Sequence, residues 1–149
     1  MTVQENVALA RSLTELYNSR HSDPKWLEKS MSAFAIDSQH MNVPLGITLP
    51  GAEGYQRTGL FFAEAFPDST IKVTNVFATE DQVVLEYKGQ GTNTGPLHLP
   101  TGDIPATGRW AELWLCDVIK VRAGKIVSYH SYYDTMTMLQ QLGLVPALG

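Results

Sequence analysis

Residues 125–143 have the sequence KIVSYHSYYDTMTMLQQLG, which combines two kinds of periodicity. The first half alternates between two sets of side chains, as expected for a β-strand. One of these sets consists of Ile126, Ser128, His130, Tyr132 and Asp134. The second half has the pattern of a short amphipathic helix that ends at Gly143. The stretch therefore predicts a strand that carries an imidazole, a phenol and a carboxylate on one face and leads directly into a helix.

A second strand is predicted for residues 110–121, and Ala123 and Gly124 form a candidate tight turn between the two strands. With a two-residue turn, His130 lies opposite Asp117, and opposed side chains have Cβ atoms about 4.5–5.5 Å apart. Asp117 interrupts an apolar run, and a buried carboxylate needs a partner unless its pKa rises. The pairing predicts an Asp117–His130 contact, which either orients a catalytic base or is a purely structural hydrogen bond. A slip of one residue in the turn would separate the two side chains.

The rest of the chain supplies helices first and strands later. Helices are predicted from the capping-box sequence at Thr2, from Asp23-Pro24, and over residues 52–65. Strands are predicted over residues 33–37, 71–77 and 83–87. Pro and Gly are frequent in residues 44–51 and 91–108, which predict loops, and the second is long enough for a lid or a binding loop. This order predicts one α+β domain, residues 1–149, with helices on one side of a curved sheet.

The composition excludes several classes of function. The formal charge of −4 and the lack of a Lys/Arg cluster argue against nucleic-acid binding. A single cysteine, Cys116, allows no intramolecular disulfide and no cysteine-based zinc site. No apolar run reaches the roughly 20 residues of a membrane span, and the first residues lack the features of a signal peptide. We therefore expect a cytoplasmic protein with no membrane partner.

Three candidate residues have alternative interpretations. Asp134 precedes a helix and has the position of an N-cap. His40 lies among helix and strand breakers, where a lone histidine is either a site residue or a surface or packing residue. Tyr17 either packs or points its phenol into a cleft. His40, Asp117, His130 and Asp134 include no close ligand pair, so no metal is expected.

Short motifs in a characteristic order resemble the SnoaL-like polyketide cyclase family, within the NTF2-like superfamily. They are AFPD (65–68), GTNTG (91–95), PATGR (105–109), VRAGKIV (121–127) and the ending from Asp134 to Gly143. The resemblance covers nearly the whole chain. It implies an NTF2-like cone, a curved antiparallel sheet that encloses a hydrophobic pocket with the N-terminal helices (an α+β barrel). It also implies a homodimer or homotetramer built through the sheet.

The resemblance further implies intramolecular aldol closure of a polyketide-like or other hydrophobic carbonyl substrate, without metal or organic cofactor. Asp134 matches the acid/base aspartate of the family, His40 matches the histidine after the first strand, and Asp117 falls at a polar pocket position. We hypothesise that Asp134 is base and later acid, that His130 and His40 donate to enolate or carbonyl oxygens, and that Asp117 orients His130. The expected substrate contacts are Tyr17, Asn42, Trp110 and Tyr132.

The chain also departs from the family pattern. Asn93 replaces a histidine, Ser128 and His130 replace a glutamate and a tryptophan, and the loop over residues 96–104 is longer. Other functions therefore stay open for the same pocket. One is water activation for epoxide opening, which ¹⁸O incorporation from solvent would reveal, and another is ketosteroid isomerisation. A third is a non-catalytic binding or dimerisation module, which would bind hydrophobic ligands without forming product.

Overall fold

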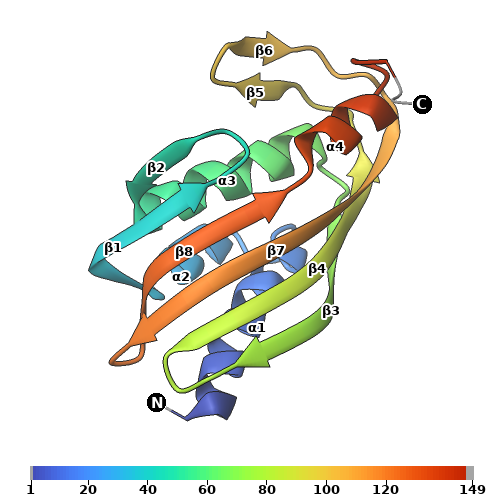
Figure 1. The fold of residues 1–149 in the computed structure, drawn as a ribbon. Coiled ribbons are helices and arrows are strands. Elements are labelled where there is room, and N and C mark those ends of the chain that lie inside the picture. The colour runs from blue at the N-terminus through green and yellow to red at the C-terminus, as the bar shows by residue number, and fades with distance from the viewer. Residues whose placement is uncertain (1, 147–149) are drawn as a thin grey trace.

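Four helices and eight strands make up the computed structural model, which describes residues 2–146 (Figure 1). The helices are α1 (Val3–Asn18), α2 (Trp26–Met31), α3 (Gly51–Ala65) and α4 (Thr135–Gln141). The strands are β1 (Phe34–Asn42), β2 (Ile47–Pro50), β3 (Thr70–Ala78), β4 (Gln82–Thr92), β5 (Leu97–Leu99), β6 (Gly102–Ile104), β7 (Trp110–Arg122) and β8 (Lys125–Tyr133). No helix among residues 2–146 has the length and apolar composition needed to cross a membrane.

The main sheet has the strand order β2-β1-β8-β7-β4-β3 and is mixed. The prediction of an antiparallel sheet is wrong at one position, because β1 and β8 run parallel. Strands β3, β4, β7 and β8 form an antiparallel series, so the direction of β8 follows from that series and not from β1. The edge strands β2 and β3 do not pair with each other. The sheet is therefore strongly curved but open, and the predicted closed barrel does not form.

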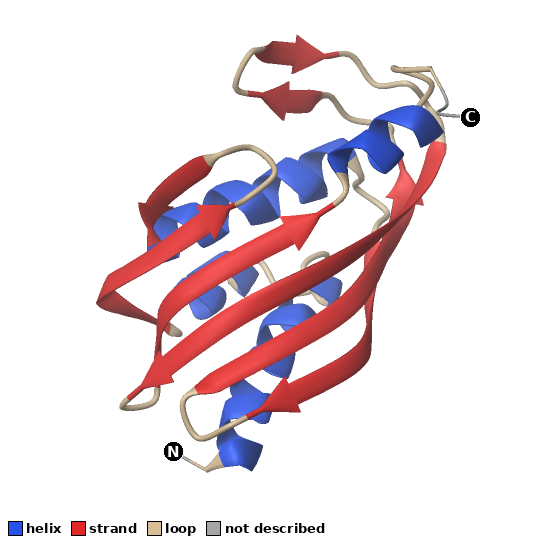
Figure 2. Ribbon diagram, viewed as in Figure 1, coloured by secondary structure: helices blue, strands red, loops and turns tan. Residues whose placement is uncertain are grey.

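Helices α1, α2 and α3 cover one face of the sheet, whereas no helix of residues 2–146 covers the other face (Figure 2). The α1 helix begins with the predicted capping box, in which the Glu5 N–H donates to Thr2 Oγ1 at 3.1 Å and the Thr2 N–H donates to Glu5 Oε2 at 2.9 Å. Its Leu13 and Tyr17 are buried toward the sheet. The α+β arrangement with helices on one side of a curved sheet is thus confirmed.

A bulge in β8 decides which side chains face the interior. The turn forms as predicted, with positive φ at Ala123 and Gly124, and Val121 pairs with Ile126. Beyond this pair β8 contains one extra residue, since Lys120 pairs with Ser128. His130 therefore pairs with Val118, and Asp117 pairs with Ser131. The predicted Asp117–His130 contact is wrong, because one inserted residue moves the following side chains to the opposite face.

Residues 91–108 form an ordered segment and not a long irregular loop. They contain the β5–β6 hairpin, and the buried side chain of Asn93 holds the segment in place. Asn93 Nδ2 donates to the carbonyls of Ala65 and Gly95 at 3.0 and 2.8 Å, and its Oδ1 accepts from the Thr107 N–H at 2.9 Å. An asparagine here thus bonds three chain segments through one buried amide.

Smaller differences concern the element ends. The α2 helix begins at Trp26 and not at Asp23-Pro24, because Asp23 accepts a hydrogen bond from the Lys25 N–H in the turn that precedes the helix. The short strand β2 lies within the loop predicted for residues 44–51. At the C-terminus, Gly143 follows α4 with a φ of +72°, as predicted for a terminating glycine.

Candidate active site

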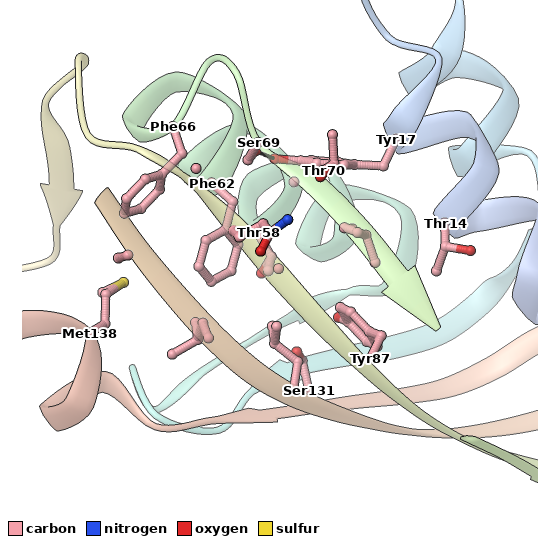
Figure 3. A pocket seen from close by; sticks show the side chains of 18 of the residues that line it. Thr14, Tyr17, Thr58, Phe62, Phe66, Ser69, Thr70, Tyr87, Ser131 and Met138 are labelled. Carbon is pink, nitrogen blue, oxygen red and sulfur yellow. Dashed lines mark hydrogen bonds between the residues drawn. The ribbon is translucent and has the colours of Figure 1, made fainter. Parts of the chain in front are cut away.

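An interior cavity of about 90 Å³ lies between the inner face of the sheet and helices α1, α3 and α4. One end is lined by Phe62, Phe66 and Met138 (Figure 3). Polar groups line other parts of the wall, and they come from elements far apart in sequence: His40, Thr58, Ser69, Ser131 and the phenols of Tyr17, Tyr87 and Tyr129. The lining, mostly apolar with a few converging polar groups, has the composition of a small-molecule site, and the volume is smaller than the roughly 300–1,000 Å³ of sites for drug-sized ligands.

Asp117 lies directly behind the cavity wall and is 1% exposed. Its Oδ2 accepts hydrogen bonds from the hydroxyl of Tyr87 at 2.8 Å and from the hydroxyl of Tyr129. No described residue donates to its Oδ1. Burial raises the pKa of Asp117 to about 6, although the hydroxyl hydrogen bonds act in the opposite direction. The carboxylate is thus held by two phenols and not by His130.

His40 extends from β1 into the cavity wall and is 1% exposed. Its ring stacks on Tyr129 with 5.0 Å between centroids and meets the edge of Tyr55 at 6.2 Å. Neither ring nitrogen has a hydrogen-bond partner within residues 2–146. Burial lowers the pKa of His40 to about 4, so the imidazole is neutral at neutral pH. A neutral imidazole has one nitrogen that donates and one that accepts a proton, and the tautomer decides which of the two is the acceptor.

Helix α3 passes close to His40 because Gly54 has no side chain. A Cβ atom at Gly54 would lie 2.6 Å from the Cβ of His40, closer than real contacts allow. The helix backbone therefore restricts the position of the imidazole.

Tyr129 links the two titratable groups. Its hydroxyl donates to the Asp117 carboxylate, and its ring face contacts the imidazole of His40. A phenol that donates to a carboxylate has a more electron-rich ring, and such a ring attracts a cation placed over its face. This attraction acts against the burial that lowers the pKa of His40 but does not outweigh it.

The pKa values of His40 and Asp117 are displaced in opposite directions, so they predict opposite dependences of stability on pH. His40 is protonated near pH 6.5 when unfolded but near about 4 when folded, so its contribution to stability is lost as the pH falls through this range. Asp117 keeps its proton up to about pH 6 in the folded protein but only to its ordinary pKa of 3.8 when unfolded. Its contribution to stability is therefore fully present below pH 3.8 and is lost as the pH rises through about 6. Each effect corresponds to about 3 kcal/mol.

Urea unfolding at several pH values checks this prediction. Asp117→Asn is expected to lose more stability than the wild type on acidification, whereas His40→Gln is expected to lose less. If the free energy of unfolding depended on pH in the same way for all three proteins, the prediction would be wrong.

Asp134 forms the N-cap of α4, as its sequence position indicated. Its Oδ1 accepts from the Thr137 N–H at 3.1 Å, and the carboxylate is exposed on the outside of the cavity wall. Hydrogen bonds from the Thr137 hydroxyl and N–H hold the pKa of Asp134 below its ordinary value. Because the cavity lining does not include Asp134, its acid/base role stays a prediction from the resemblance.

The other predicted site residues divide between the inside and the outside. Tyr17 lines the cavity, and Asn42 is buried beside it, where it donates to Thr58 Oγ1 at 3.2 Å. His130, Tyr132 and Trp110 are not among the residues that line the cavity. The centroids of the His130 and Tyr132 rings are 6.4 Å apart, and Trp110 is 54% exposed.

Sequence reasoning missed the tyrosines that bind Asp117. Tyr87 follows Val83 and Leu85 at a spacing of two on β4, a pattern that points all three side chains to the same face. This signal was available in the sequence. The alternation of residues 126–134 places Tyr129 on the face opposite His130, but only the bulge in β8 makes that face the interior one. Within residues 2–146, no three His, Cys, Asp or Glu side chains gather into a candidate metal site.

A sequence profile for SnoaL-like polyketide cyclases matches residues 8–142. The chain belongs to this family. None of the curated proteins compared with this SnoaL-like chain matches it in sequence.

Several solved structures share the fold of the SnoaL-like chain. IdmH of Streptomyces antibioticus, a candidate polyketide cyclase, is 27% identical with a TM-score of 0.71, over 92% of this chain and 97% of that one. AclR of Streptomyces galilaeus, a candidate hydroxylase, is 20% identical with a TM-score of 0.79, over 99% and 91%. A protein of Catenulispora acidiphila with a ketosteroid isomerase-like fold is 18% identical with a TM-score of 0.66, over 89% and 93%. The NTF2-like fold implied by the resemblance is confirmed.

Proposed function

We propose that this SnoaL-like protein is a cofactor-independent acid/base enzyme that closes a ring in a hydrophobic carbonyl compound by intramolecular aldol addition. The observation that carries the proposal is His40, a buried neutral imidazole at the cavity with no hydrogen-bond partner among the described residues. Titratable groups whose pKa values are displaced from their ordinary values concentrate at catalytic sites. His40 and Asp117 are two such groups, joined through Tyr129.

In the proposed reaction, the unprotonated nitrogen of His40 accepts the proton from the carbon next to a substrate carbonyl. The electron pair of the broken C–H bond forms the enolate. The enolate carbon then bonds to a second carbonyl carbon of the same molecule, and the imidazolium returns its proton to the new alkoxide. No electron donor or acceptor is needed.

The low pKa of His40 restricts the substrate. A base whose conjugate acid has a pKa of about 4 is weak, so the reaction requires an acidic C–H bond, such as one flanked by two carbonyls. A carboxylate base of similar pKa is sufficient for enolisation in ketosteroid isomerase. Asp117 acts as a positioning residue, since it reaches His40 only through Tyr129.

Exchange of α-protons with D₂O, followed by NMR, tests the proposal. Phenylacetone and 1-phenylbutane-1,3-dione are suitable probes, because each has one aromatic ring and an enolisable carbon. We expect exchange faster than in buffer alone, with a rate that persists to about pH 5 because His40 stays unprotonated there. The absence of acceleration with both probes would overturn the proposal. Hydrolysis of styrene oxide with ¹⁸O uptake would favour water activation instead.

Replacing Asp134 with Ala separates its two possible roles. If Asp134 is only the cap of α4, Asp134→Ala is expected to lower the free energy of unfolding by about 1 kcal/mol and to leave α-proton exchange unchanged. Chemical denaturation and the exchange assay measure the two effects. A folded variant without exchange activity would instead assign the acid/base role to Asp134.

The outer face of the sheet supports a proposal about assembly. Trp114 and Tyr132 are 57% and 43% exposed on adjacent strands, and large exposed aromatic groups are common in interfaces. We propose that this face mediates a homodimer. Trp114→Glu is expected to convert the dimer to a monomer in light scattering after size exclusion, whereas Ile36→Glu, at another exposed apolar position, is expected to have no effect. A monomeric wild-type protein would contradict the assignment.

A further inference from the structure

Arg20 is a buried cation, 9% exposed, that contacts Tyr17 and Ser69 of the cavity lining without lining the cavity itself. Its Nη1 donates to the Tyr17 carbonyl at 3.0 Å, and its Nη2 donates to the Pro67 carbonyl at 2.8 Å and to Ser69 Oγ at 3.3 Å. The guanidinium also lies over the Tyr17 ring, 4.2 Å from its centroid. Arg20 forms no ion pair with a carboxylate of the described residues. The nearby Asp68 carboxylate accepts from the Thr92 N–H at 2.7 Å, and this hydrogen bond together with the Arg20 charge holds the pKa of Asp68 below its ordinary value.

Tyr17 and Ser69 stand between Arg20 and the cavity, and both line it. Their hydroxyl oxygens are 2.6 Å apart, so one of the two hydroxyls donates to the other. Arg20 can only donate hydrogen bonds, and it donates one to Ser69 Oγ, so it does not accept the proton of the Ser69 hydroxyl. Whichever hydroxyl donates within the pair, the other keeps its proton free. Burial raises the pKa of Tyr17, so the phenol does not ionise at neutral pH.

This pair lies across the cavity from the end where Asp117 is held. In Figure 3, Tyr17 and Ser69 are on the side opposite Tyr87 and Ser131. The hydroxyl of Tyr87 donates to Asp117, and Ser131 lies opposite Asp117 in the pairing of β7 with β8. The cavity therefore has polar groups on two opposite sides.

We propose that the Tyr17–Ser69 pair, with Arg20 behind it, is a subsite for a carboxylate of the substrate. The free hydroxyl donates to the carboxylate, and the buried guanidinium adds an attraction that water screens only weakly. A neutral acceptor receives the hydrogen bond without this attraction. If the proposed function holds, the carbonyl of the substrate lies at His40. The substrate is then a keto acid whose carboxylate lies at Tyr17 and Ser69.

NMR titration with phenylacetate and phenylacetamide tests the subsite, because the two probes have almost the same shape and differ in charge. The wild type is expected to bind phenylacetate about tenfold or more tightly than phenylacetamide. The double variant Tyr17→Phe/Ser69→Ala is expected to lose affinity for both probes, since each single variant keeps one free hydroxyl. Arg20→Gln is expected to remove the preference, because glutamine is uncharged, whereas Arg57→Gln changes the net charge equally outside the cavity and is expected to keep it.

Equal affinities of the wild type for the two probes, or an unchanged affinity of the double variant for phenylacetate, would overturn the subsite. The double variant keeps the test valid if Arg20→Gln does not fold. The result is independent of the proposed function, because it measures binding alone. A carboxylate preference without α-proton exchange would support the subsite and reject the enolising enzyme.

Discussion

His40→Gln is expected to slow enzyme-catalysed α-proton exchange by about 100- to 10,000-fold, the usual contribution of a general acid/base. The amide of glutamine does not accept a proton at any pH at which the protein folds, whereas the neutral imidazole of His40 does. The substrate affinity should change much less, because most of the cavity surface is contributed by other side chains. Exchange rates at saturating and limiting probe concentrations separate the two effects.

His130→Gln is the matched control for this experiment. It makes the same chemical change on the neighbouring strand, at a residue outside the cavity lining. Its exchange rate is expected to equal that of the wild type. A large loss of rate in His130→Gln, with little loss in a folded His40→Gln, would transfer the acid/base role to the other histidine.

Asp117→Ala is expected to lower the free energy of unfolding by about 3–5 kcal/mol. The change leaves the buried hydroxyls of Tyr87 and Tyr129 without their acceptor, and each lost partner costs about 1–3 kcal/mol. The removed carboxylate also leaves a cavity. Asp117→Asn should cost less, because its carbonyl oxygen still accepts a hydrogen bond and no charge is buried. Urea denaturation at neutral pH measures both changes.

Asp103→Ala provides the comparison for a carboxylate on the surface. The Asp103 side chain is 65% exposed and contacts the exposed His98, so its removal is expected to change stability by less than about 1 kcal/mol. An Asp117→Ala protein as stable as Asp103→Ala would show that the two tyrosines do not depend on Asp117.

Local sequence signals predicted the elements that depend on neighbouring residues. The capping box at Thr2 and the turn at Ala123 and Gly124 formed as predicted. So did the helix predicted for residues 52–65, and the cap and terminating glycine of α4. Each of these depends on contacts or backbone angles within a few residues, which the sequence contains directly.

The candidate site was only partly predictable. His40, Tyr17 and Asp117 were identified by their residue types and positions, and the cavity includes or adjoins all three. The tyrosines that hold Asp117 come from β4 and β8. Arg20 lies in the turn after α1, and Ser69 directly precedes β3. These partners are separated by 12 to 52 residues in the chain, so no local pattern relates them.

By itself, the sequence determined the α+β class and most of the elements, because propensity, periodicity and turn chemistry are local, and the resemblance of its motifs indicated the family. Only the tertiary structure decided which face of β8 meets Asp117. Ile126 and Tyr129 are both buried, at 0% and 4% exposure, although a regular strand would place them on opposite faces. The extra residue between them resolves this conflict by a bulge, and the bulge turns His130 outward and places Tyr129 beside Asp117. The packing of the whole sheet favours that bulge, and no single stretch of sequence encodes it.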